Sequence, residues 1–366
     1  VDIDGAVDMA STLAVAGVLT GSSLDISGDV DIDGTLNVDA IDCDGTLDVN
    51  SAGSNIVATF TSTDTIGGIK LVDNAGNVEL SAEGNVFLVQ PAGGVATFKV
   101  SATDLSTPTA GTDNVRFGEN AGNSIASGGL RNVLIGTNAG TALTTGDSNV
   151  AIGWEALKTE DTHANSVAVG ASALATQNAG ADAYNVAMGY NAGTAVTTGV
   201  QNTLIGGLAG VSINTGNNNT ALGYLALDGT DDGSSNVAVG YASLRGNVGN
   251  SNTSVGNSAL SSTSNTASNN TAVGSSAGSA VTTGVQNTLI GGLAGDALTT
   301  GVQNVAVGYN ALSTEDEHGA NVAVGMNALA TQNAGADAYN TAVGHAAGAA
   351  VTTGVQNTLI GGLAGD

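Results

Sequence analysis

Two loops combine the side chains that most often bind metal ions or transfer protons. Each loop carries two adjacent carboxylates followed, two residues later, by a histidine. The residues are Glu160, Asp161 and His163 in KTEDTH, and Glu315, Asp316 and His318 in STEDEH. No His-x-His or Cys–His spacing accompanies either set, and such spacing is typical of metal sites. We therefore predict solvated loops and no bound metal, with a cation site as the alternative.

Patterns expected of an enzyme are missing from the sequence. A nucleophilic triad needs a positioned serine, histidine and acid, yet no GxSxG elbow occurs. Glycan hydrolysis needs two carboxylates flanking a sugar-sized cleft, whereas the acids of the repeats lie in variable loops. We predict no enzymatic activity and no cofactor.

Five aromatic residues recur at one place, directly after a glycine in a repeated phrase. They are Trp154, Tyr190, Tyr224, Tyr241 and Tyr309. An aromatic ring offers a sugar an apolar face beside a polar tip. If the repeats stack in register, these rings form one edge, which we predict to be a candidate glycan contact. Packing of each ring over the next repeat is the alternative.

The repeated phrase that positions these residues reads Asn, Val or Thr, a third residue that is usually small, a large apolar residue, then Gly. Counting Asn as position one, the aromatic residues occupy position six. Fifteen copies follow one another 16 to 19 residues apart, most often 17. They begin at 114, 132, 149, 166 (where Ser replaces Asn), 185, 202, 219, 236, 252, 270, 287, 304, 321, 340 and 357. A fixed period of this kind is typical of a solenoid, in which each repeat buries its apolar side chains against its neighbours.

Within each repeat, side chains at positions two and four share one face of a short strand. We expect this aliphatic face to form the dry interior of the stack. Gly at position five is expected to end the strand. Position eight is Ala or Ser and position nine Gly or Leu, which indicates a tight corner. Runs such as 194–201 predict a second short strand before the next Asn.

The asparagines at position one are predicted to form a ladder in which each side-chain amide bonds the neighbouring coil. The predicted members are Asn132, Asn149, Asn185, Asn202, Asn219, Asn236, Asn287, Asn304 and Asn321.

Three regions succeed one another along the chain. Residues 1–50 alternate Asp with apolar residues and predict an acidic shaft of short strands. Their Asp-x-Asp-Gly pieces lack the full calcium-loop pattern, so we interpret them as a solvated face. Residues 51–112 contain strand and turn signals of a small antiparallel β domain with a linker. Residues 113–366 form the repeat region. The predicted class is all-β: an elongated trimeric fibre with a C-terminal parallel β-solenoid of about fifteen 17-residue coils.

Charge and composition limit the partners. Six Lys and Arg against 32 Asp and Glu give a net charge of −26, so we predict no nucleic-acid partner and no insertion into a membrane. No apolar run approaches the roughly 20 residues of a membrane span. The one cysteine, Cys43, excludes an intrachain disulfide.

The segments NSVAVGASALA at 165–175, NVAVGYNAL and NTAVGHAAG resemble the head repeats of trimeric autotransporter adhesins. That resemblance covers about residues 113–366 and implies a trimeric parallel β-roll, although the family typically repeats every 14 residues. The order of acidic shaft, small β domain and glycine-rich repeats is similar to bacteriophage tail fibres.

Together these observations predict a homotrimeric virion fibre at the virion surface. It would act as a rigid spacer and host-recognition element, joined to other virion or fibre proteins at its ends and touching host glycans. A bacterial surface adhesin or an extracellular filament subunit is the alternative.

Overall fold

The computed structural model describes residues 111–366 except 230–231 and 247–248, together with the backbone of five strands between residues 66 and 106. The chain divides into two units, Val1–Thr59 and Phe60–Asp366, and every described residue belongs to the second. The acidic shaft predicted for residues 1–50 lies outside the described residues. The described part is all-β, and in it no helix is long and apolar enough to cross a membrane.

A five-stranded antiparallel sheet precedes the repeats. Its order is β1-β2-β3-β4-β5, so each strand pairs with the next along the chain. The strands are β1 (Ile66–Val72), β2 (Asn77–Glu83), β3 (Val86–Pro91), β4 (Phe98–Val100) and β5 (Leu105–Ser106). They fall within residues 51–112, where the sequence predicts hairpins.

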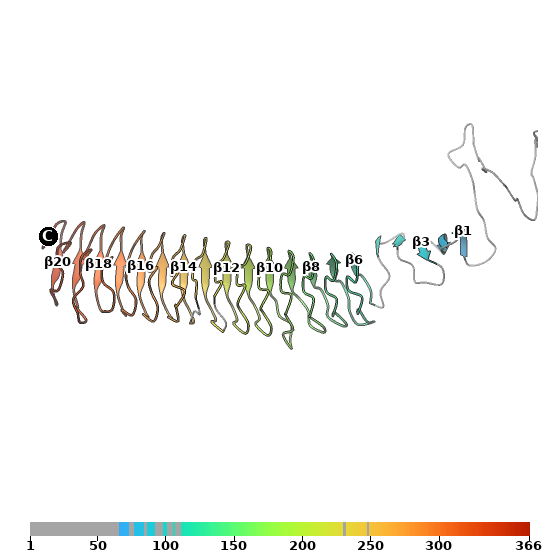
Figure 1. Ribbon diagram of the computed structural model, residues 1–366, viewed down its shortest axis with the longest axis horizontal. Helices are drawn as coiled ribbons and strands as arrows, with labels where there is room; N and C mark the ends of the chain where they lie inside the picture. Colours follow the sequence, from blue (N-terminus) through green and yellow to red (C-terminus); the bar gives the residue numbers. More distant parts are fainter. Residues whose placement is uncertain are drawn as a thin grey trace, which may run out of the picture. The chain divides into compact units, whose positions relative to one another are not determined.

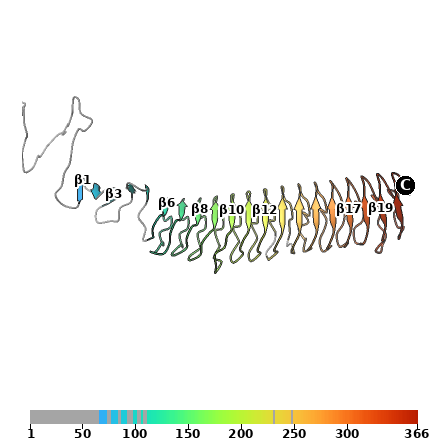
Figure 2. The ribbon, with the colours of Figure 1, turned by 180° about the vertical axis from the view of Figure 1, so that it is seen from behind.

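The repeats form a parallel β-solenoid with one three-residue strand in each coil. Its single sheet has fifteen strands in unbroken chain order, which delimit fourteen complete turns (Figures 1 and 2). The strands are β6 (Val115–Phe117), β7 (Val133–Ile135), β8 (Val150–Ile152), β9 (Val167–Val169), β10 (Val186–Met188), β11 (Thr203–Ile205), β12 (Thr220–Leu222), β13 (Val237–Val239), β14 (Thr253–Val255), β15 (Thr271–Val273), β16 (Thr288–Ile290), β17 (Val305–Val307), β18 (Val322–Val324), β19 (Thr341–Val343) and β20 (Thr358–Ile360). The register is exact from coil to coil, as in the pairing of Ala187 with Leu204. The predicted parallel solenoid is therefore confirmed.

Glycine at position five lets the coils lie this close. Its φ is between 124° and 144° in all fifteen coils, a region that side chains with a Cβ rarely enter. A Cβ added to Gly223 would also lie 2.5 Å from the carbonyl oxygen of Gly240 in the next coil. The glycine column thus permits both the bend after each strand and the approach of successive backbones.

The expectation that positions two and four fill the interior is wrong. A three-residue strand has one inward side chain, and it is the middle one, at position three. Leu134, Ala187 and Leu204 are fully buried there, whereas position-four side chains such as Leu222 and Ile290 are 47% and 39% exposed. The core consists of positions three, eight, nine and twelve.

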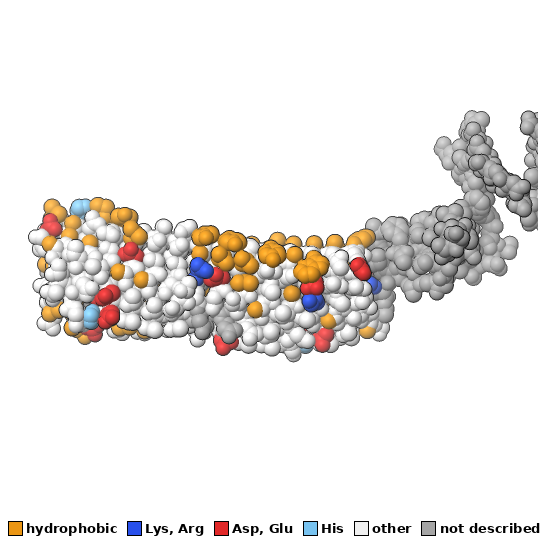
Figure 3. All heavy atoms as spheres, viewed as in Figure 1, with side chains coloured by type: hydrophobic (Ala, Val, Ile, Leu, Met, Phe, Trp, Pro, Cys, Tyr) orange, Lys and Arg blue, Asp and Glu red, His pale blue; other side chains and the backbone are white. Residues whose placement is uncertain are grey.

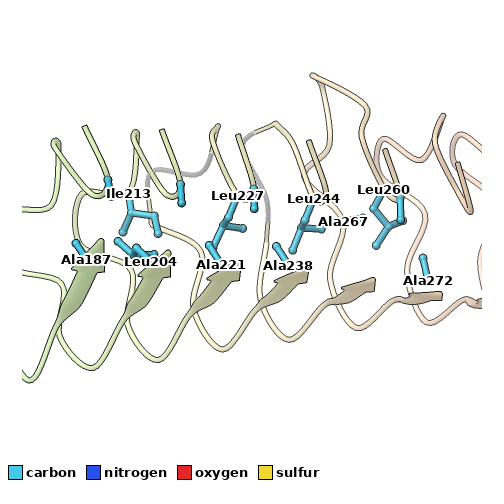
Figure 4. Packing of buried hydrophobic residues seen from close by; sticks show 14 of the residues in the cluster. Ala187, Leu204, Ile213, Ala221, Leu227, Ala238, Leu244, Leu260, Ala267 and Ala272 are labelled. Carbon is cyan, nitrogen blue, oxygen red and sulfur yellow. The ribbon is translucent and has the colours of Figure 1, made fainter. Parts of the chain in front are cut away.

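Positions nine and twelve compete for one space in the core. Figure 4 shows Ile213, Leu227 and Leu244 extending from the wall opposite the strands toward side chains such as Leu204. A Cβ on Gly210 at position nine would lie 2.8 Å from Cδ1 of Ile213 at position twelve. Where position nine is Gly, position twelve is accordingly a large aliphatic residue. These residues are Ile125, Leu143, Val196, Ile213, Val281, Leu298 and Val351.

Seven coils instead place Leu at position nine, with φ between 46° and 56°. The left-handed conformation costs a leucine about 1–2 kcal/mol. Full burial of its side chain contributes about 1.5–3 kcal/mol, so burial offsets the strain. In four of these coils position twelve is a buried polar residue, namely Glu160, Gln177, Glu315 or Gln332.

The second strand predicted in each coil is absent from the described residues. Residues 194–201 form turns and bends, and their threonines bond the neighbouring coil through side chains as well as backbone. The Oγ1 of Thr197, for example, donates to the carbonyl oxygen of Asn214 at 3.4 Å, beside the backbone bond from Thr197 N to the same oxygen at 3.0 Å. The segment starts after Gly193 and ends at Gln201, which both adopt left-handed conformations with φ of 59° and 60°.

Candidate functional site

A buried hydrogen-bonded ladder of asparagines runs beside the strands. The Oδ1 of one asparagine accepts the backbone N–H of the asparagine in the next coil, as from Asn304 N to Asn287 Oδ1 at 2.9 Å. The Nδ2 donates to a carbonyl about fourteen residues onward, as from Asn287 to Gly301 O at 2.8 Å. All nine asparagines assigned to the ladder are at most 1% exposed, and each accepts the N–H of the next coil's position one through Oδ1. Eight of them also make the onward Nδ2 bond, whereas Asn321 Nδ2 donates to the carbonyl of Gly319 at 3.2 Å. Each amide satisfies backbone groups that would otherwise be buried unpaired.

A buried glutamine bridges two members of the ladder in two coils, Gln177 beside Ser166 and Gln332 beside Asn321. Ser166 still donates its backbone N–H to Asn149 Oδ1 at 3.0 Å, but its side chain is too short to continue the ladder. Gln177, which is fully buried, donates through Nε2 to Ser166 Oγ at 2.8 Å and accepts from Asn185 Nδ2 at 2.8 Å. Sequence reasoning missed Gln177 and Gln332; their signal was the recurrence of Gln at the same place in two repeats.

The two Glu-Asp-His sets each converge on a small volume. One potential ligand atom from every member lies within 4.8 Å of the others in both sets. His163 Nδ1 is 2.9 Å from Glu160 Oε1 and 4.0 Å from Asp161 Oδ1. Glu160 is fully buried, and its other oxygen accepts from Gln177 Nε2 at 3.0 Å.

The second set repeats this geometry. His318 Nδ1 is 3.2 Å from Glu315 Oε1, and Gln332 Nε2 donates to Glu315 Oε2 at 3.4 Å. Glu315 is again fully buried, while the histidine side chain keeps 22% exposure. Both loops thus differ from the solvated loops predicted, because in each loop the glutamate is part of the core.

The aromatic residues at position six line one exposed edge. Each has an exposure of 51–63%. Tyr224 and Tyr241 stack with ring centroids 6.0 Å apart and planes inclined by 17°. The ring of Tyr224 also covers Gly207 of the preceding coil, since a Cβ on that glycine would lie 3.3 Å from Tyr224 Cδ2. Tyr224, Tyr241 and Tyr309 therefore contact a neighbouring coil along the solenoid axis, and all five rings remain half open to solvent.

Two further exposed aromatics were not singled out from the sequence. Tyr184 and Tyr339 immediately precede position one and are 55% and 58% exposed. Both adopt left-handed backbone conformations, with φ of 51° and 53°, at a corner different from that of position six.

Two ionisable groups have pKa values displaced by burial. Arg116 replaces the usual apolar residue at position three of β6, donates through Nε to the carbonyl of Ala121, and has its pKa lowered by desolvation. Desolvation raises the pKa of Asp296, whose Oδ1 is the buried side-chain atom without a hydrogen-bond partner among the described residues.

The outer face of the solenoid sheet carries a regular array of apolar side chains. Position four is apolar in all fifteen coils and position two is Val in eight and Thr in seven. Seven position-four side chains are 36% exposed or more: Phe117, Met188, Leu222, Val273, Ile290, Val343 and Ile360. In the view of Figure 3, hydrophobic side chains gather on the upper edge of the solenoid in separate stretches, with uncharged surface between them. Neither position is charged in any coil, although the chain carries a net charge of −26.

A scan against protein-family models, a search of curated proteins and a search of solved structures found no match to this chain.

Proposed function

We propose that this chain is a structural segment of an extracellular fibre, in which three copies associate through the outer faces of their solenoid sheets. The observation that carries the proposal is the outward aliphatic array. Of thirty side chains at positions two and four, twenty-three are apolar and the other seven are threonine.

Burial of this array would stabilise association by about 25 cal/mol for each Å² of apolar surface removed from water. Apolar patches that run the length of a molecule mark interaction surfaces in soluble proteins. Because acidic side chains lie elsewhere, repulsion between copies opposes contact through the other surfaces and leaves this face as the favoured interface.

The solenoid is suited to holding a recognition element at a distance. Fourteen turns at about 4.8 Å each extend roughly 70 Å. Every turn is bonded to the next through strand pairs, and every coil except that of Ser166 also through asparagine amides, which favours a stiff rod. We assign the fibre to a virion surface, as part of a phage tail or capsid fibre that contacts other fibre or virion proteins. A bacterial surface adhesin or extracellular filament subunit is the second candidate.

The exposed edge of Trp154, Tyr190, Tyr224, Tyr241 and Tyr309 supports a role in contacting host-surface glycans. Half-open rings along one line offer stacking surfaces to successive sugars. Trp154→Ala with Tyr190→Ala should abolish binding to host cells or a glycan array. Retention of binding by the double variant would exclude this edge as the contact.

The association is tested by the mass of the chain in solution. Light scattering should give 105.6 kDa, three times the 35.2 kDa of one chain. Leu222→Glu with Ile290→Glu should reduce the mass to that of one chain, because both side chains are already exposed in the single solenoid. Asn257→Glu, at exposed position six, is the matched control and should leave the mass unchanged. A wild-type mass of 35.2 kDa would refute the shared interface.

Immunolabelling tests whether the fibre belongs to a virion or to a bacterial surface. Gold-labelled antibodies against the solenoid should decorate virions if the first assignment holds, and bacterial envelopes if the alternative does.

A further inference from the structure

We propose that Glu160, Asp161 and His163, and equally Glu315, Asp316 and His318, form two sites for a divalent transition-metal ion, with zinc as the probe of choice. Zinc binds histidine nitrogen and carboxylate oxygen, commonly with solvent completing four ligands. Each loop presents this donor set with its ligand atoms within 4.8 Å of one another.

The electrostatics of each site favour a divalent cation. Glu160 is fully buried, and the Asp161 carboxylate lies beside the same histidine nitrogen, 4.0 Å from it. A buried carboxylate is costly unless an opposite charge compensates it. The two carboxylates of each set carry a formal charge of −2, which one divalent ion neutralises. The net charge of −26 attracts cations to the whole chain.

The access and the framework of the site also suit an ion. The side chains of His163 and Asp161 are 20% and 44% exposed, so an ion can reach them from solvent, while Glu160 lies buried behind them. Hydrogen bonds from the preceding coil and from the asparagine ladder hold the loop in place. The Oγ1 of Thr144 donates to the carbonyl of Asp161 at 3.0 Å, and Asn149 Nδ2 donates to the carbonyl of His163 at 2.9 Å.

Residues 148–210 recur with substitutions at 303–365, and this internal duplication supplies an independent observation. Comparison of residues 158–166 with 313–321 shows that five of the nine positions differ. The four retained positions are Thr159, Glu160, Asp161 and His163, which become Thr314, Glu315, Asp316 and His318. All three proposed ligands therefore persist in a loop where most other positions have changed.

Zinc titration of the full chain, followed by calorimetry and by metal analysis after dialysis, tests the proposal. His163→Ala should remove one zinc ion per chain, His318→Ala one, and the double variant two. His345→Ala is the matched control, because this third histidine is exposed at position six and belongs to neither set. Calcium should bind these two sites far more weakly, since it prefers six to eight oxygen ligands.

A second pair of substitutions separates metal binding from folding. Asp161→Asn with Asp316→Asn leaves each buried Glu–His hydrogen bond in place and removes one anionic ligand per site. Zinc affinity should fall at least tenfold, while the far-ultraviolet spectrum in chelator matches that of the wild type. Equal zinc stoichiometry in the wild type and the double histidine variant would overturn the proposal. So would a wild-type chain that binds no zinc, in which case the histidines serve only as hydrogen-bond partners of the glutamates.

Discussion

Removal of one ladder amide should lower the free energy of unfolding of the solenoid strongly, because two buried backbone groups lose their hydrogen-bond partners. Asn287→Ala takes the acceptor from the backbone N–H of Asn304, at 2.9 Å, and the donor from the carbonyl of Gly301, at 2.8 Å. Asn287 is 1% exposed, so water cannot replace these partners without local opening. An unsatisfied buried polar group costs about 1–3 kcal/mol, which gives roughly 2–6 kcal/mol for the two groups.

The assay follows both global and local stability. The urea midpoint of unfolding should fall, and hydrogen exchange of the Asn304 amide should accelerate, because opening of one coil interface no longer breaks this bond. Asn257→Ala removes an amide at exposed position six and should change the free energy of unfolding by no more than about 0.5 kcal/mol. If Asn287→Ala shifts the midpoint no further than this control and leaves exchange at Asn304 unchanged, the ladder does not hold the coils together.

Three further substitutions have defined outcomes. Gly223→Ala should prevent correct stacking, seen as loss of the cooperative unfolding transition, because its Cβ would meet the Gly240 carbonyl at 2.5 Å; a wild-type transition would contradict this reasoning. Ser166→Asn should raise the free energy of unfolding by about 0.5–1.5 kcal/mol, because the new Oδ1 can accept the backbone N–H of Asn185. Asn321 Oδ1 accepts the N–H of Asn340 in this way at 3.2 Å in the second copy of the duplication. A lower urea midpoint would show that the buried Gln177 side chain leaves no space for the larger residue. Asp296→Asn should stabilise the fold at neutral pH. Burial raises the folded pKa of Asp296, so the folded state binds more protons than the unfolded state and loses stability as pH rises through this range. The increase in the free energy of unfolding caused by Asp296→Asn should therefore become smaller below the ordinary carboxyl pKa. Urea unfolding at several pH values measures this increase, and an increase that does not change with pH would refute the reasoning.

Much of the solenoid follows from the repeat itself. The strict recurrence of Asn and Gly fixes where each strand begins and ends, and the 16–19-residue period fixes one strand per coil in a parallel sheet. What the pattern leaves open is which strand face points inward. Alternation places positions two and four together, but it assigns them equally to either side. Their aliphatic character favoured the interior, whereas the small Ala at position three gave little sign of a core residue.

Contacts between coils explain the remaining differences. Coils combine either Gly at position nine with a large residue at position twelve, as in Gly210 and Ile213, or Leu at position nine with a polar residue, as in Leu157 and Glu160. The two positions share one space in the core, and this is visible only in the folded coil. The burial of Glu160 and its bond to Gln177, seventeen residues away, could not be read from the acidic loop KTEDTH. By contrast, the exposed aromatic edge follows directly from register once the coils stack.

Self-contact at the outer sheet face is the most direct test of the proposed assembly. In a Cys43→Ser background, Leu222→Cys should form covalent dimers under mild oxidation, because parallel copies in register bring the same residue of each chain together. Asn257→Cys, on an exposed corner, should remain monomeric on a denaturing gel. Oxidised Leu222→Cys that stays monomeric, or cross-links no faster than Asn257→Cys, would contradict the assembly through this face.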